Sequence, residues 1–272
     1  MTSRHRTRAV VSLAALDMRR RPDHRAELTS QLLMGETVRL LRRSTDGRWW
    51  EAENRADGYR GWVREWGLVL ASPARVARWT RRASARVWTL FVEVREGPGR
   101  GALVTPLFWN ARVIPVASKG RFRLIELPDG RRGWLAAAAL ESRRARRDLA
   151  ARVRGLLGVP YLWGGRTPLG FDCSGFTQQV LAEQGLAIAR DAEEQCRRAR
   201  PLRKGEQPRS GDLVFFGPPG GATGHVGLGL GGGYYAHCRR HVRINSVDPY
   251  NPLHDNELNA QMRGWRRPLR RA

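Results

Sequence analysis

The first part of the chain alternates short apolar and polar stretches. Residues 37–41 and 49–52 alternate in the way that half-buried strands do. Asp-Gly dipeptides at 46–47 and 57–58 are typical of hairpin turns. We therefore predict a small all-β barrel over residues 9–72.

Residues 85–141 repeat this plan, with apolar runs that precede another Asp-Gly turn at 129–130. In both copies the turn is followed by Gly, Trp and an apolar residue, at 61–63 and at 133–135. Such self-similarity indicates an internal repeat. We predict a second barrel of the same kind over residues 85–141.

From residue 142 the pattern changes from strands to helices followed by strands. Residues 142–157 combine arginines with apolar residues at helical spacing, and the apolar face is expected to pack on the rest of the domain. Another helix is predicted to begin at Cys173, and a third near the acidic residues 190–195. Helices before strands predict an α+β domain over residues 142–272.

Four strands are predicted after these helices, and the chain of 272 residues is long enough for the three domains. Residues 208–216 are expected to form a turn that leads into a buried strand, and the other strands are expected at 224–230, 234–238 and 242–247.

The net charge of +24 raises the possibility of a nucleic-acid partner. The basic residues are almost all arginines, however, and they occur in every segment rather than along one stripe. We therefore expect no nucleic-acid partner, although a basic surface would suit an acidic substrate or polymer.

Three cysteines, Cys173, Cys196 and Cys238, argue against a disulfide framework and for a reducing compartment. An apolar run at 9–16 follows arginines, as in a minimal signal peptide, but it reads equally well as a first β-strand. We expect a cytoplasmic protein, with export to the cell envelope as the alternative. No apolar stretch is long enough to predict an integral membrane span.

Cys173 has the context of a nucleophile. A thiol at a helix N-terminus lies near the positive end of the helix dipole and near unpaired N–H groups, and both favour the thiolate. His225 opens a strand among glycines, and His237 lies across the following hairpin, where cross-strand side chains can touch. A triad is therefore predicted, in which Cys173 attacks a carbonyl, His225 protonates the leaving amine and His237 orients His225.

The oxyanion of such a reaction needs hydrogen-bond donors where its charge develops. We expect the backbone N–H of Cys173 to be one donor and the hydroxyl of Tyr161 to be another.

Four motifs carry a family resemblance, which covers about residues 155–270. They are Tyr-Leu-Trp-Gly-Gly at 161–165, Asp-Cys-Ser-Gly-Phe at 172–176, Gly-Asp-Leu at 211–213, and His-Val-Gly at 225–227 with His237. Together they resemble the NlpC-type papain-like cysteine peptidases, which cut peptidoglycan peptides. With two bacterial SH3-like barrels in front, the chain is similar to γ-D-glutamyl-L-diamino acid endopeptidases of murein peptide turnover.

The resemblance implies hydrolysis of the γ-D-Glu–diamino acid bond in peptides with a free N-terminal L-Ala, because in that subgroup the first barrel closes off the cleft. It assigns Cys173, His225 and His237 to the triad with Tyr161 assisting. It also implies five substrate-binding residues: Asp172 and Ser174 lining the cleft, Asp191 meeting the substrate amine, and Glu27 and Tyr59 from the first barrel.

Other interpretations remain. Cys173 can be a small buried apolar residue, the histidines can be ordinary core residues, Tyr59 can belong to the barrel core, and Glu27 can be a solvated charge. A zinc site of Cys173, His225, His237 and Cys238 is disfavoured, because adjacent strand residues point to opposite faces.

The whole chain is therefore predicted to be a multidomain cysteine-type endopeptidase, with two small all-β SH3-like barrels followed by an α+β papain-like catalytic domain. We expect a monomer that acts on a peptidoglycan-derived peptide, with no cofactor and no metal. The alternative is a non-catalytic protein whose tandem barrels bind cell-wall peptide or polymer.

Overall fold

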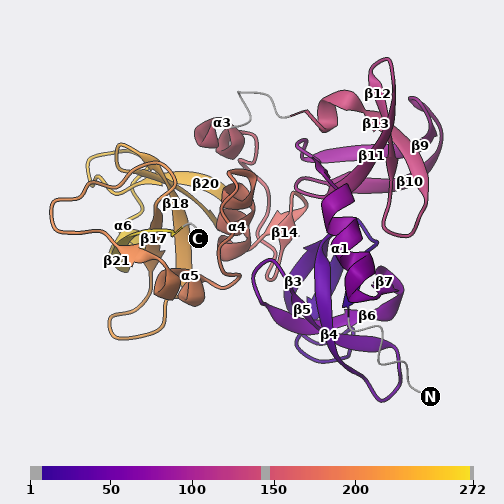
Figure 1. Cartoon of the computed structure of the whole chain (residues 1–272). Helices are drawn as coiled ribbons and strands as arrows, with labels where there is room; N and C mark the ends of the chain where they lie inside the picture. Colours follow the sequence, from indigo (N-terminus) through magenta and orange to yellow (C-terminus); the bar gives the residue numbers. More distant parts are fainter. Residues whose placement is uncertain (1–7, 142–147, 270–272) are drawn as a thin grey trace. The chain divides into compact units, whose positions relative to one another are not determined.

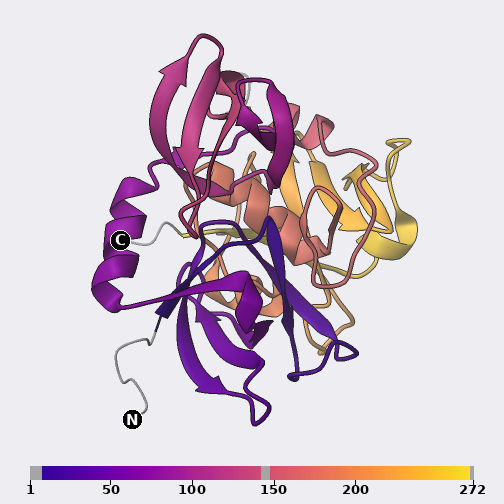
Figure 2. The same ribbon diagram turned by 90° about the vertical axis from the view of Figure 1, so that its right-hand side faces the viewer.

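The computed structural model describes residues 8–141 and 148–269 (Figures 1 and 2). The chain divides into two compact units, Met1–Ser142 and Arg143–Ala272, and each is considered by itself. The first half of the helix predicted over 142–157 lies largely outside the described residues.

The first barrel is a sheet of seven antiparallel strands, as the alternating pattern predicts. Their order is β3-β2-β6-β5-β4-β1-β7, and the inward side chains form an apolar core that includes Val11, Met18 and Leu32. The apolar run at 9–16 lies in β1, β2 and the turn between them. The elements are β1 (Arg8–Val11), β2 (Ala15–Arg19), β3 (Leu28–Leu33), β4 (Thr37–Arg43), β5 (Trp49–Asn54), β6 (Arg60–Arg64), the 3-10 helix η1 (Glu65–Gly67) and β7 (Leu68–Ala71).

The second barrel has six strands in the order β10-β9-β13-β12-β11-β8. The repeated Gly-Trp motif occupies the same place in both barrels, on β6 and on β13. Each of these strands follows a turn glycine at positive φ, +81° at Gly58 and +88° at Gly130, and each leads into a 3-10 helix. The elements are β8 (Ala85–Arg86), β9 (Phe91–Gly97), β10 (Arg100–Phe108), β11 (Arg112–Lys119), β12 (Phe122–Glu126), β13 (Arg132–Ala136) and η2 (Ala137–Ala139).

A helix that the sequence analysis did not predict, α1 (Pro73–Arg82), connects the barrels (Figure 1). Its start has ordinary signals, since the side chain of Ser72 caps it and Pro73 is its first residue. Val76 and Trp79 pack against apolar residues of both barrels, and the Trp79 indole N–H donates to the Gly35 carbonyl at 3.0 Å. The helix therefore fastens the two barrels into one unit.

The second unit is an α+β domain built on a sheet of order β16-β21-β17-β18-β19-β20. Helix α4 packs against β18 and β19 and buries the apolar face that the sequence predicts (Figure 1). The last strand, β21, was not predicted. The elements are α3 (Leu149–Arg154), β14 (Arg166–Thr167), β15 (Gly170–Phe171), α4 (Cys173–Glu183), α5 (Ala192–Arg198), β16 (Arg200–Pro201), β17 (Leu213–Phe216), β18 (His225–Gly231), β19 (Tyr234–Arg239), β20 (His241–Ser246), α6 (Asn256–Asn259) and β21 (Met262–Arg267).

An ion pair joins α3 to the C-terminal end of α4. The guanidinium of Arg152 donates two hydrogen bonds of 2.6 Å to the carboxylate of Glu183, whose side chain is fully buried. A buried charge that loses its partner is strongly destabilising. The pair therefore ties α3 to the helix that begins at Cys173.

We predict that Glu183→Gln destabilises the protein by about 3 kcal/mol or more, because it replaces one charge of a buried ion pair with a neutral amide. Urea unfolding of the full chain measures the change. The matched control is Glu194→Gln, which removes two ion pairs at the surface of α5, with Arg197 and Arg198, and is expected to cost less than about 1 kcal/mol. Equal losses in the two variants would contradict the prediction.

Candidate active site

Helix α4 begins at Cys173 because three contacts hold its first turn in place. Asp172 is the N-cap and accepts a hydrogen bond of 2.6 Å from the Gly175 N–H. Its other carboxylate oxygen accepts from the Gly164 N–H at 2.9 Å. At Gly175 a Cβ atom would lie 2.2 Å from the Gly165 carbonyl oxygen, so that only glycine allows this approach. The turn at 161–165 and the helix start are thus one packed unit.

Arg190 completes this arrangement from the segment before α5. Its guanidinium donates to both oxygens of Asp172, at 2.5 and 3.0 Å, and to the Ser174 hydroxyl at 3.0 Å. All three residues are buried. The bidentate pair neutralises the Asp172 charge beneath the nucleophile. Sequence reasoning missed Arg190, because its partner lies 18 residues away.

The structure gives Asp172 and Ser174 an internal role of capping and pairing. Their predicted role in lining the substrate cleft stays a prediction.

The Cys173 side chain is buried, with 7% of its surface exposed. The backbone N–H groups of Val226 and Ser174 favour the thiolate and lower the pKa of the thiol. Burial nevertheless raises the pKa of the thiol to about 12, and the Asp172 carboxylate adds to the rise. The expectation that the helix start favours the thiolate was therefore wrong for the protein without substrate, because the cost of burying the charge outweighs the stabilisation by the helix terminus.

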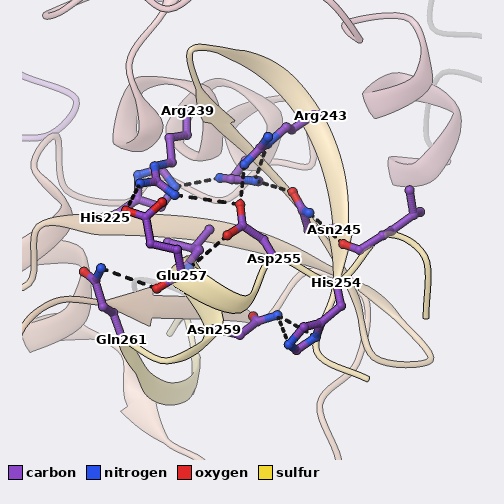
Figure 3. Close-up of polar contacts among 12 residues, drawn as sticks. His225, Arg239, Arg243, Asn245, His254, Asp255, Glu257, Asn259 and Gln261 are labelled. Carbon is purple, nitrogen blue, oxygen red and sulfur yellow. Dashed lines mark hydrogen bonds and ion pairs between the residues drawn. The ribbon is translucent and has the colours of Figure 1, made fainter. Parts of the chain in front are cut away.

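His225 and His237 are brought together as predicted. Their rings meet edge to face, and His225 Nε2 lies 2.7 Å from His237 Nδ1. His237 is fully buried, and its Nε2 lies 2.8 Å from the side-chain oxygen of Asn245 (labelled in Figure 3). Sequence reasoning missed Asn245, which belongs to the next strand, β20, and carries no motif of its own.

Both imidazoles are held neutral. Burial lowers the pKa of His225 to about 3, and the neighbouring charges of His237, Arg239 and Arg243 lower it further. Burial also lowers the pKa of His237 to about 4, against the Asn245 hydrogen bond, which raises it. A neutral imidazole can accept a proton, so that His225 is in the correct form for a general base.

Tyr161 belongs to the same site. Its N–H donates to the Arg240 carbonyl at 2.7 Å, which ties the turn to the end of β19. Burial raises the pKa of its phenol, and the nearby charges of Cys173 and Asp172 raise it further. The phenol is therefore a neutral O–H donor near the nucleophile, as an oxyanion donor must be.

Cys238 faces away from His237. Its thiol donates to the Phe171 carbonyl at 3.2 Å, whereas His237 bonds to His225 and Asn245. The two residues therefore point to opposite faces of β19, as strand alternation requires.

The other predicted substrate residues are at the surface or in the first unit. Asp191 is exposed at the N-cap of α5 and makes no side-chain cap bond there. Glu27 is exposed next to β3 and pairs with Arg20, and Tyr59 packs half-buried on the first barrel's core. The roles of these three residues stay predictions.

Comparisons with known proteins find relatives of both parts of the chain. Residues 158–263 match the model of the NlpC/P60 family, and residues 18–68 match that of the bacterial dipeptidyl-peptidase Sh3 domain. Dipeptidyl-peptidase 6 of Lysinibacillus sphaericus is 26% identical over 92% of this chain and 95% of its own length. A gamma-D-glutamyl-L-lysine dipeptidyl-peptidase of Bacillus cereus is 27% identical over 83% of this chain and 71% of its own.

The crystal structure of an NlpC/P60 family protein from Bacillus cereus has the same fold. It superposes with a TM-score of 0.78 at 22% identity, over 96% of this chain and 99% of that one. Residues 158–263 thus match an NlpC/P60 domain that follows an all-β SH3-like region, and the predicted fold class is confirmed. Among the helices that the structure describes, none has the length and apolar character of a membrane span.

The lowered histidine pKa values predict how stability depends on pH. Below the ordinary histidine pKa of 6.5, His237 takes up a proton in the unfolded chain, whereas in the folded chain it stays neutral down to about pH 4. The protein therefore becomes less stable as the pH is lowered from 6.5 to 4. One such group changes the free energy of unfolding by about 1.4 kcal/mol per pH unit. At the other end, the raised pKa of Cys173 means that stability falls as the pH rises above 9.0, where the unfolded thiol ionises.

Urea midpoints at pH 7 and pH 5 test the acidic side of this prediction. Wild type should lose stability between the two, and His237→Gln should show a smaller difference. The same difference in both proteins would mean that His237 is not the group responsible.

Proposed function

We propose that the protein is a cysteine endopeptidase that hydrolyses the γ-D-Glu–diamino acid bond of peptidoglycan-derived peptides. The observation that carries the proposal is the pair of His225 and His237, whose ring nitrogens lie 2.7 Å apart on β18 and β19. The helix that begins at Cys173 packs on these two strands. The names of the two long relatives, both dipeptidyl-peptidases, support the same reaction class.

The reaction starts from a neutral thiol and a neutral imidazole. As the Cys173 sulfur attacks the substrate carbonyl, its proton moves to His225, and the tetrahedral intermediate carries its negative charge on the former carbonyl oxygen. The Cys173 N–H at the helix start and the Tyr161 hydroxyl are the donors for this oxyanion. Proton transfer at the moment of attack removes the need for a stable thiolate.

The intermediate then collapses with loss of the amine. His225 returns its proton to the leaving nitrogen, and the γ-glutamyl group stays on sulfur as a thioester. Water attacks this thioester with His225 as base, which releases the carboxylate product and restores the thiol. His237 keeps the His225 ring in place through both steps.

We further propose that the substrate needs a free N-terminal L-Ala. A cationic amine requires an anionic partner, and Asp191 offers an exposed carboxylate in the catalytic domain. The contributions of Glu27 and Tyr59 remain part of this proposal, as does a cytoplasmic location, which rests on the free cysteines.

We predict that Cys173→Ala loses at least about three orders of magnitude in kcat while keeping its fold, because no other group can form the thioester. Release of the diamino acid from L-Ala-γ-D-Glu–diaminopimelate measures activity, and circular dichroism checks the fold. The matched control is Cys196→Ser on α5, which should keep full activity. Unchanged hydrolysis by Cys173→Ala would remove the mechanism, and an inactive wild type would favour the binding-protein alternative.

We predict that N-acetylation of the same peptide abolishes cleavage, because it removes the positive charge that an acidic partner recognises. Parallel assays of the free and acetylated peptides provide the measurement. Cleavage of both at equal kcat/KM would retain the peptidase and refute the amine requirement. Asp191→Asn should raise KM for the free peptide more than it lowers kcat.

A further inference from the structure

His237 has a second polar contact on the side away from His225, and the predicted triad does not account for it. The His237 Nε2 lies 2.8 Å from Oδ1 of Asn245. His237 is fully buried, and Asn245 is 8% exposed. A buried polar pair of this kind determines which nitrogen of a neutral imidazole carries the proton.

The orientation of the Asn245 amide follows from its other partner. The Asn245 Nδ2 lies 2.6 Å from the backbone carbonyl oxygen of Leu253, which also accepts the Ser246 N–H at 3.0 Å. A carbonyl oxygen can only accept, so the NH₂ group of Asn245 must face Leu253. The amide oxygen therefore faces His237.

The proton positions of both histidines follow in turn. Since the Asn245 oxygen only accepts, His237 carries its proton on Nε2 and has a bare Nδ1. That Nδ1 lies 2.7 Å from His225 Nε2 and must accept from it. His225 then has its proton on Nε2 as well, and its Nδ1 is left bare. This nitrogen is the one that remains to take the proton of Cys173.

A second contact of His237, with Arg243, would favour the opposite tautomer. The Arg243 Nε lies 3.3 Å from the same His237 Nε2, and an arginine N–H can only donate. A bond from Arg243 would reverse both histidines and put a proton on His225 Nδ1. Asp255 holds the Arg243 guanidinium at 2.6 Å (Figure 3), and Asn245 has the shorter contact with His237.

We propose that Asn245 is a positioning residue that sets the tautomers of His237 and His225, and thereby leaves the proton-accepting nitrogen of His225 bare. The chain of contacts runs from the Leu253 carbonyl through Asn245 and His237 to His225. The kinetic consequence rests on the proposed peptidase function, whereas the proton positions do not.

NMR of the full chain with ¹⁵N-labelled histidine tests the proton positions directly, because two-bond ¹H–¹⁵N spectra distinguish the two neutral tautomers. Signals are assigned with His225→Gln and His237→Gln. In wild type at pH 7 both histidines should carry the proton on Nε2. In Asn245→Leu the His237 signals should move toward the tautomer protonated on Nδ1.

Asn259→Leu is the matched control. Asn259 is a half-buried asparagine that bonds to the Tyr235 hydroxyl, the Ser246 carbonyl and the His254 ring, but to neither His225 nor His237. Its substitution should leave both tautomers unchanged. Asn245→Asp keeps an acceptor opposite His237 and should keep the wild-type tautomers, which makes the test independent of whether the leucine variant folds.

Kinetics with the free peptide give the second readout. Asn245→Leu should lower kcat by about tenfold or more with little change in KM, because part of the general-base contribution is lost, and Asn245→Asp should recover most of it. Unchanged tautomers in Asn245→Leu would overturn the proposal, whatever the rate. Shifted tautomers in a chain that never cleaves the peptide would overturn the peptidase function and leave the role of Asn245 standing.

Discussion

The site depends on the close approach of the α4 start to the glycine turn that precedes it. Gly175 has no room for a side chain beside the Gly165 carbonyl, and Asp172 ties both segments together through backbone N–H groups. Arg190 then neutralises the Asp172 carboxylate in a buried position. Because a buried charge without a partner is costly, these contacts stabilise one another, and the position of Cys173 follows from all of them.

Burial also determines the resting chemistry. It raises the pKa of the Cys173 thiol and lowers those of both histidines, so that each group is neutral before substrate arrives. A nucleophile and a base in this form exchange a proton when the substrate carbonyl is attacked, rather than in advance. The N–H groups at the helix start then act on the developing charge of the intermediate. These N–H groups therefore stabilise the intermediate more than they lower the pKa of the resting thiol.

The two barrels share one local structural pattern. A turn glycine at positive φ, a strand with Gly-Trp and a 3-10 helix recur in both, and α1 packs its Val76 and Trp79 face on the two together. The helix was not predicted, although Ser72 and Pro73 are ordinary start signals, because it lies between two stretches of alternating strands. The strands β16 and β21 were also not predicted, since few apolar positions distinguish them.

The sequence by itself determined the fold class, all-β barrels before an α+β domain, together with the helix that starts at Cys173 and the histidine pair across the β18–β19 hairpin, because these features depend on local periodicity, turn residues and near neighbours. Only the tertiary structure decided what surrounds them. Arg190 reaches Asp172 across 18 residues, and Asn245 reaches His237 from a neighbouring strand. Burial reversed the expected ionisation of Cys173. Desolvation and contacts between distant segments depend on how the whole domain packs, and no local pattern in the chain records them.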